Sequence, residues 1–144
     1  MALPPKLQEI VADFSGMSRE EKLETLLAYA ETLPDIPDRL RQRFDRMEDV
    51  PECMTPVRVL AERQPDGGLI YYFDIPPHSP TVRGLASLLS GGLNGSLPEE
   101  ILAVPADFYL PMKLEEAITQ QRITGFMGVL AHMKHIAVQT LQGS

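Results

Sequence analysis

The residue best suited to chemistry in this chain is Cys53, the one cysteine among 144 residues. A single thiol cannot form a disulfide within the chain, nor can it alone hold an iron–sulfur cluster or a tetrathiolate zinc ion. Two roles remain, a small buried hydrophobe or a single reactive sulfur. Pro51 and Pro56 flank the residue, and Glu52 and Arg58 lie close to it. Because prolines and charges suit loops, we expect Cys53 on a loop and at least partly accessible.

Other side chains could tune the reactivity of this thiol. The carboxylate of Glu52 disfavours the thiolate, whereas a guanidinium close in space would favour it, and the candidates are Arg58, Arg83 and Arg122. Arg83 and Arg122 lie near the starts of predicted helices, where the alternative is an ordinary surface arginine. His78 lies on a predicted loop and could serve as a base or as a cation beside the thiol. The alternative for His78 is a solvent-exposed loop histidine.

Two further histidines raise the question of a metal site. His132 and His135 share a face of a predicted helix at a spacing of i, i+3, which is loosely typical of metal ligands. No acidic residue or cysteine lies close to them in the sequence to complete a ligand set. We therefore predict no bound metal, and the sequence indicates no cofactor.

Composition and charge predict one ordinary globular domain over residues 1–144. The chain is 44% hydrophobic and 23% charged, close to globular averages. A formal net charge of −7 argues against nucleic acid and anionic membranes as partners, and favours a basic or mixed-charge protein. The sequence has no apolar run of about 18 residues, and its start lacks the pattern of a signal peptide. We expect a cytoplasmic protein, in which a free thiol stays reduced.

The first half of the chain predicts two helices and then a hairpin. Apolar residues at helical spacing run from Leu7 to Phe14 and again from a capping box at Ser18 and Glu21 toward Pro34. Helical spacing is weaker over residues 38–49. Alternating and β-branched residues at 57–60 and 69–73 flank a turn at 64–68, which predicts an antiparallel hairpin directly behind the cysteine.

The second half predicts helices. Ser79 and Pro80 are typical of a helix start, and we expect that helix to end at residues 91–92, which are both glycine. Ser96 and Glu99 form a second capping pattern, and an apolar stripe from 123 to 136 predicts a long last helix that closes near residue 143. The element order indicates an α+β domain.

Three stretches together resemble the SufE/CsdE family of sulfur-acceptor proteins, over about Leu7 to Ala137. The first, PECMTPVRVL, resembles the family's cysteine loop that leads into a strand. The second, TVRGLASLLSGGLNGSLPEEIL, is similar to its Lys/Arg-Gly-Leu helix and the cap that follows. The third, QRITGFMGVLAHMKHIA, is similar to its Arg-x-x-Gly helix.

This resemblance implies a small antiparallel sheet with helices packed on it, related in fold to the scaffold protein IscU. It also implies that Cys53 is the acceptor for persulfide sulfur from a pyridoxal-phosphate (PLP) dependent cysteine desulfurase. The protein would stimulate that desulfurase and pass the sulfur on to an iron–sulfur assembly scaffold complex. Such a carrier performs at most half of a sulfurtransferase reaction by itself.

The chain departs from the family pattern around the cysteine. Glu52 replaces a glycine, Arg58 stands where a tryptophan is usual, and Pro76-Pro77-His78 replaces Asp-Ser-Asp. These departures keep open a second hypothesis, an interaction module of the same fold that binds a desulfurase or assembly complex without carrying sulfur. A third hypothesis is a thiol enzyme that uses Cys53 and His78 without a partner.

Overall fold

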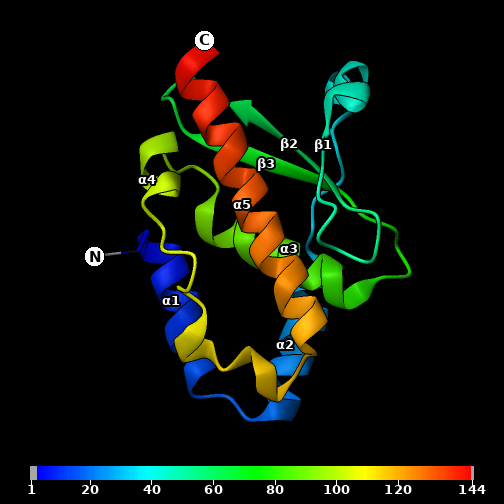
Figure 1. Ribbon diagram of the computed structural model, residues 1–144, viewed down its shortest axis with the longest axis vertical. Coiled ribbons are helices and arrows are strands. Elements are labelled where there is room, and N and C mark those ends of the chain that lie inside the picture. Colours follow the sequence, from blue (N-terminus) through cyan, green and yellow to red (C-terminus); the bar gives the residue numbers. More distant parts are fainter. Residues whose placement is uncertain (1–2, 144) are drawn as a thin grey trace.

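The computed structural model describes residues 3–143, in which helices pack against a three-stranded antiparallel sheet (Figure 1). The α-helices are α1 (Pro5–Ser15), α2 (Arg19–Glu31), α3 (Pro80–Leu93), α4 (Pro98–Leu102) and α5 (Gln120–Gly143). The strands are β1 (Glu48–Asp49), β2 (Arg58–Arg63) and β3 (Leu69–Asp74), and the 3-10 helices are η1 (Asp38–Arg46), η2 (Leu110–Met112) and η3 (Leu114–Glu116). The α+β class is confirmed.

The sheet has the order β1-β2-β3, and both pairings are antiparallel. Strands β2 and β3 form the predicted hairpin, with Arg58 opposite Asp74 at one end and Arg63 opposite Leu69 at the other. The turn contains Gly67 at φ +90°, a left-handed conformation that glycine adopts without strain. The sequence did not predict β1, because a strand of two residues is too short to show alternation.

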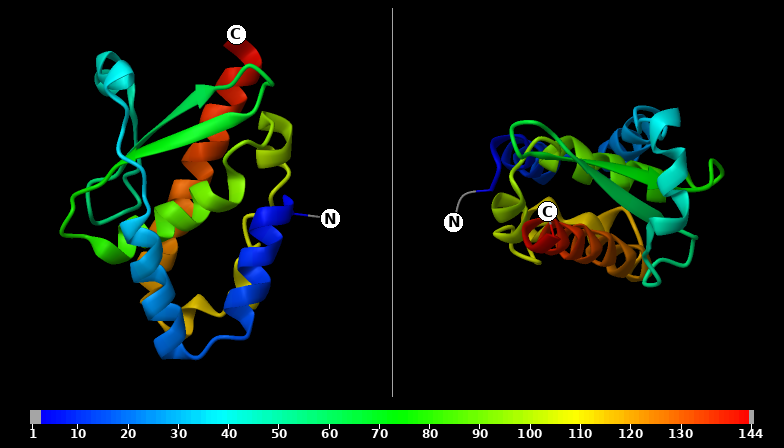
Figure 2. Two further views of the ribbon diagram at one scale, coloured as in Figure 1. Left: turned by 180° about the vertical axis from the view of Figure 1, so that it is seen from behind. Right: turned by 90° about the horizontal axis from the view of Figure 1, so that it is seen from above.

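Helices α3 and α5 cover the hairpin and frame the core. α5 lies against β2, and α3 lies against β3 (Figures 1 and 2). The hydroxyl of Tyr71 in β3 donates a hydrogen bond of 2.8 Å to the carbonyl of Met133 in α5. Both residues are fully buried, so this bond ties the sheet to the long helix inside the core. The middle of α5 is thereby fixed against β3.

The N-terminal helices brace α3 from the other side. A Cβ atom at Gly84 in α3 would lie 2.2 Å from the carbonyl oxygen of Leu26 in α2, so the two helices approach backbone to backbone. The predicted capping box at the start of α2 is confirmed. Glu21 N–H donates to Ser18 Oγ at 3.2 Å, and Ser18 N–H donates to Glu21 Oε1 at 2.8 Å.

Two predicted helix boundaries were wrong by one or two residues. Helix α3 continues through residues 91–92 to Leu93, because Gly92 serves close packing: a Cβ there would lie 2.8 Å from the Leu7 side chain of α1. The cap of α4 is one residue later than predicted. Leu97 precedes the helix and its N–H donates to Glu100 Oε1 at 2.7 Å, so Ser96 and Glu99 do not form the capping pair.

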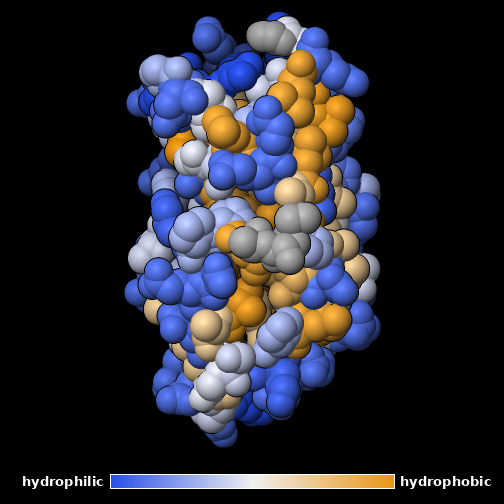
Figure 3. All heavy atoms as spheres, turned by 90° about the vertical axis from the view of Figure 1, so that its left-hand side faces the viewer, coloured by the Kyte–Doolittle hydropathy of each residue, from blue (hydrophilic) through white to orange (hydrophobic). Residues whose placement is uncertain are grey.

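The side of the molecule turned away from the cysteine is mostly polar. Figure 3 shows a broken stripe of hydrophobic side chains among hydrophilic ones on this side. The large hydrophobic residues that are exposed in residues 3–143 are spread over several elements, with Met54 the most exposed at 78%. Within the same residues, no helix is long and apolar enough to span a bilayer.

Candidate functional site

Cys53 lies on a short loop between β1 and β2, residues 50–57, which we call the cysteine loop. Its base is closed by a hydrogen bond of 2.9 Å from Val50 N–H to the carbonyl of Val57. A second bond, 3.2 Å from Cys53 N–H to the carbonyl of Val50, turns the chain back at the cysteine. Cys53 is half-buried, as a loop residue that is partly accessible should be. The hairpin therefore provides a fixed base for the cysteine loop.

Two glycines of α5 make room for the cysteine loop. The Sγ atom of Cys53 lies 3.5 Å from the carbonyl oxygen of Gly125. A Cβ atom at Gly125 would lie 2.9 Å from this sulfur, and one at Gly128 would lie 2.7 Å from Cβ of Glu52. Real Cβ atoms almost never approach so closely. The Arg122-x-x-Gly125 pattern thus has a physical reason, since a side chain at Gly125 would displace the thiol.

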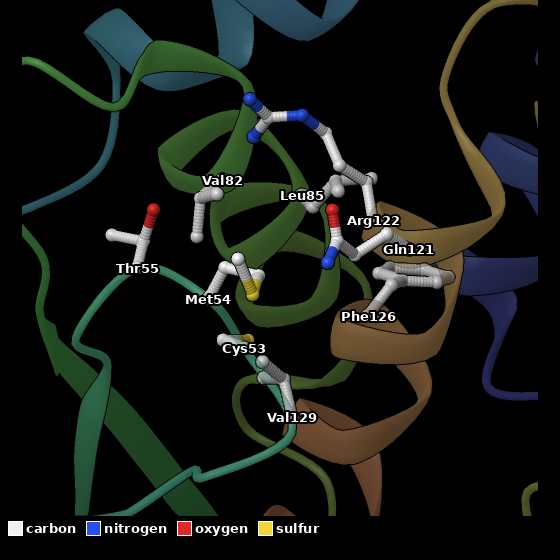
Figure 4. Close-up of a pocket in the computed structure, with 9 residues that line it drawn as sticks. All are labelled: Cys53, Met54, Thr55, Val82, Leu85, Gln121, Arg122, Phe126 and Val129. Atoms are coloured by element: carbon white, nitrogen blue, oxygen red, sulfur yellow. The ribbon is translucent and has the colours of Figure 1, made fainter.

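The thiol borders an apolar pocket between the cysteine loop, α3 and the first turns of α5 (Figure 4). The pocket has a volume of about 90 Å³. Its lining comprises Cys53, Met54, Thr55, Val82, Leu85, Gln121, Arg122, Phe126 and Val129. Arg122 contributes the one charged side chain of this lining. The sulfur is therefore sheltered mainly by hydrocarbon, with a guanidinium at the rim.

This environment keeps the thiol protonated at rest. The pKa of Cys53 is raised from 9.0 to about 11, first by burial and second by the negative charge of Glu52. No arginine of the described chain lowers it. Since the thiolate is the nucleophile, the resting site holds its sulfur in an unreactive form.

The predicted site residues divide into those that lie beside the thiol or line its pocket and those that stabilise the surrounding loops. Arg122 lines the pocket, and Glu52 neighbours the thiol directly. Arg58 pairs with Asp74 at 2.6 Å and donates to the carbonyl of Phe44, beside a groove on the other side of the cysteine loop. These contacts hold the hairpin ends together.

Arg83 and His78 lie outside the pocket lining. Arg83 donates a hydrogen bond of 2.9 Å to the carbonyl of Ile75 and so fixes the connection between β3 and α3. His78 lies on the same connection and is exposed. In the part of the chain that the structure describes, no hydrogen bond or ion pair joins His78 to Cys53. The geometry thus gives the thiol enzyme hypothesis no catalytic pair.

His132 and His135 do meet carboxylates, from elements distant in the sequence. His132 Nε2 lies 3.1 Å from Glu52 Oε1, and His132 Nδ1 contacts Glu48 Oε2. His135 Nδ1 lies 2.8 Å from Glu48 Oε1. Across residues 3–143, no group of three or more His, Cys, Asp or Glu side chains could hold a metal ion. These histidines therefore act in a hydrogen-bond network.

Sequence reasoning missed most of the pocket. Its apolar walls come from Val82 and Leu85 in α3 and from Phe126 and Val129 in α5. A signal was present, because Arg122, Phe126 and Val129 share one helix face at i, i+4 and i+7. Nothing in the sequence showed that this face turns toward the cysteine loop.

Comparison with known proteins assigns the chain to a family. The family model described as "SufE: Fe-S metabolism associated domain" matches residues 8–137. The chain belongs to the SufE family. An uncharacterized SufE-like protein of Mycobacterium tuberculosis is 37% identical to this SufE chain over 133 residues, which are 92% of each chain. The family that the sequence motifs resembled is therefore confirmed.

Further relatives extend this assignment across distant organisms. SufE-like protein 1, chloroplastic/mitochondrial, of Arabidopsis thaliana is 31% identical over 94% of this SufE chain, which spans 36% of that protein. The cysteine desulfuration protein SufE of Plasmodium vivax is 25% identical over 97% of the chain and 56% of its own length. The solution structure of a hypothetical protein from Thermus thermophilus superposes with a TM-score of 0.86 at 34% identity, covering 99% of this chain and all of that one. The SufE fold is thus confirmed.

Proposed function

We propose that this SufE protein accepts persulfide sulfur on Cys53 from a PLP-dependent cysteine desulfurase and stimulates that enzyme. It then passes the sulfur to an iron–sulfur assembly scaffold complex in the cytoplasm. Relatives from two Plasmodium species are named cysteine desulfuration proteins, which supports this sulfur chemistry. The observation that carries the proposal is that the one cysteine of the chain lies on a loop with its sulfur beside an apolar pocket.

The proposed transfer is a thiol–persulfide exchange. The Cys53 thiolate attacks the terminal sulfur of the desulfurase persulfide, the sulfur–sulfur bond of the donor breaks, and the donor cysteine leaves as a thiolate. One persulfide and one thiol are consumed, and one persulfide and one thiol are formed. No external oxidant or reductant is required, and the proton of Cys53 ends on the donor sulfur. Delivery downstream repeats the exchange with an acceptor thiol.

The pocket fits both stages of this cycle. Before transfer, burial keeps the thiol neutral, so Cys53 reacts slowly with small oxidants and other thiols. Attack requires a thiolate, which a docked desulfurase would favour by moving the cysteine loop out of its apolar surroundings. After transfer, the pocket beside Cys53 offers the extra sulfur atom a site shielded by hydrocarbon, with Arg122 at its rim. Met54, exposed beside the cysteine, provides an apolar contact for the partner.

The decisive experiment measures sulfur on Cys53. The purified protein is incubated with a cysteine desulfurase and cysteine, and intact-mass spectrometry without reductant should show a gain of one sulfur atom. Cys53→Ser should show no gain and should no longer stimulate the desulfurase. An unchanged mass of the parent protein, or an equal gain in Cys53→Ser, would exclude sulfur acceptance at this residue.

The second candidate function is an interaction module that binds the desulfurase or assembly complex without carrying sulfur. The raised pKa of Cys53, to which Glu52 contributes, is the observation in its favour. This candidate predicts that Cys53→Ser binds and stimulates the desulfurase as well as the parent does, and that neither protein forms a persulfide. The same mass measurement therefore separates the two functions.

A further inference from the structure

Two carboxylates hold the ring of His132 from opposite sides. Glu52 of the cysteine loop lies at Nε2, 3.1 Å away, and Glu48 of β1 lies at Nδ1. Glu48 also contacts His135, one turn further along α5. Strand β1, the cysteine loop and α5 are thereby joined in one polar network next to the thiol.

The geometry of this network places a carboxylate oxygen at each ring nitrogen of His132. An ionised carboxylate only accepts hydrogen bonds, whereas a neutral imidazole has one N–H. Both contacts of His132 are hydrogen bonds when both ring nitrogens carry hydrogen, and such charge-assisted bonds are stronger than neutral ones. The titratable groups that face this ring are Glu48 from β1 and Glu52 from the cysteine loop, with His135 of α5 on the far side of Glu48.

The contact with Glu52 is the one that opens more easily. Glu48 has two histidine partners and a side chain that is 18% exposed. The Glu52 side chain is 42% exposed, and within residues 3–143 His132 is its hydrogen-bond partner. Loss of this bond leaves Glu52 free to turn into water, while Glu48 keeps a partner on α5.

We propose that His132 is a positioning residue that latches the cysteine loop onto α5 through Glu52 and so keeps Cys53 beside its pocket. The stem of Glu52 lies on Gly128, and the sulfur of Cys53 lies on Gly125, so releasing Glu52 frees two neighbouring residues from the helix. Cys53 and Met54 also line a second groove on the opposite side of the loop, which provides space for movement. The latch controls access to the thiol whether or not Cys53 accepts sulfur, and the two proposals can fail separately.

The test is the rate of alkylation of Cys53 by iodoacetamide at neutral pH, which reports one site because the chain has one cysteine. The asparagine side chain in His132→Asn is too short to reach Glu52. This variant should raise the alkylation rate roughly fivefold or more, since the hydrogen bond that holds Glu52 is lost. His132→Gln carries an amide N–H close to the position of Nε2 and should stay near the parent rate. His135→Ala is the matched control, because it removes a second Glu48 contact on the same helix without touching Glu52.

Variants of Glu52 separate the latch from the charge effect on the thiol. Glu52→Gln removes the charge but still accepts a hydrogen bond, whereas Glu52→Ala removes both. We expect Glu52→Ala to react faster than Glu52→Gln, and the addition of His132→Asn to Glu52→Ala to give no further increase. Faster hydrogen exchange of residues 50–57 should accompany the faster alkylation.

Three results would overturn the latch. The first is a parent-like rate in His132→Asn with an unchanged melting temperature. The second is an equal increase in His135→Ala, which would indicate general loosening at α5. The third is an equal alkylation rate in Glu52→Ala and Glu52→Gln. If His132→Asn fails to fold, this comparison of the two Glu52 variants tests the latch instead, because Glu52 is exposed and its substitution should leave the fold intact.

Discussion

The cysteine loop meets α5 through two regions of opposite character. On one side Cys53 faces a pocket walled by Phe126 and Val129, where hydrocarbon disfavours a charged sulfur. On the other side Glu52 meets His132, where a hydrogen bond of 3.1 Å between their side chains holds the loop in place. Burial in the apolar region is the larger cause of the raised pKa of Cys53 and Glu52 the smaller one, and we infer that the polar region also sets the position of the thiol. Two adjacent residues thus meet α5 through different kinds of contact, and variants in each region test the two contacts in turn.

The largest expected effect comes from removing the apolar wall. Phe126 is 2% exposed, and its ring packs against Phe108 and Tyr109 at centroid distances of 5.9 and 6.1 Å. Phe126→Ala should lower the free energy of unfolding by about 3–5 kcal/mol, because it leaves a cavity in the core. Urea denaturation measures this loss, and Met127→Ala, at a residue 37% exposed, is the control expected to change by less than about 1 kcal/mol. Similar losses in both variants would contradict the assigned role of the pocket wall.

The next effect concerns the ionisation of the thiol. With the pKa of Cys53 at about 11, the thiolate fraction at neutral pH is about a hundredfold smaller than for an unperturbed thiol. The alkylation rate should keep rising with pH until the thiolate forms, and its midpoint should lie near that value. Glu52→Gln should lower the midpoint by less than opening the pocket does, because burial is the larger cause. A midpoint at the ordinary cysteine value in the parent protein would show that the pocket does not desolvate the sulfur.

A smaller effect is expected where the cysteine loop packs against α5. Gly125→Ala places a Cβ at 2.9 Å from the sulfur and should displace the thiol toward solvent. Lost packing of the cysteine loop should lower the free energy of unfolding by about 1–3 kcal/mol. The better helix propensity of alanine should offset up to about 1 kcal/mol of this loss. The measurements are thermal unfolding and the alkylation rate. Gly143→Ala, with nothing within 4 Å of the added atom, is the matched control, and equal behaviour of the two variants would speak against a close contact.

The smallest effect is expected at the end of the β2–β3 hairpin where Arg58 lies opposite Asp74. Arg58 and Asp74 form an ion pair at 2.6 Å, but their side chains are 36% and 45% exposed. A double-mutant cycle should therefore give a coupling below about 1 kcal/mol. A coupling well above this value would mean that the hairpin end, in addition to α5, determines the position of the loop.

The sequence predicted those elements whose pattern lies in residues close together along the chain. The hairpin behind Cys53, the capping box at Ser18 and the long last helix all follow from local patterns, and each is present. The pocket and the histidine network depend on contacts between distant segments: His132 and Glu52 are 80 residues apart. Spacing on α5 could show which residues share a face, but only the packing of α5 on the hairpin shows what that face meets.

The glycines under the cysteine loop have a consequence for local unfolding. Each glycine lowers the intrinsic stability of a helix interior by about 1 kcal/mol relative to alanine, and Gly125 and Gly128 lie within one turn of each other. This turn of α5 depends on the loop that covers it. When a partner lifts the loop, the helix beneath should fray on its own, and its amides should exchange as a unit with those of the loop. Under the proposed function, sulfur delivery would begin with the cooperative opening of two segments that are far apart in the chain.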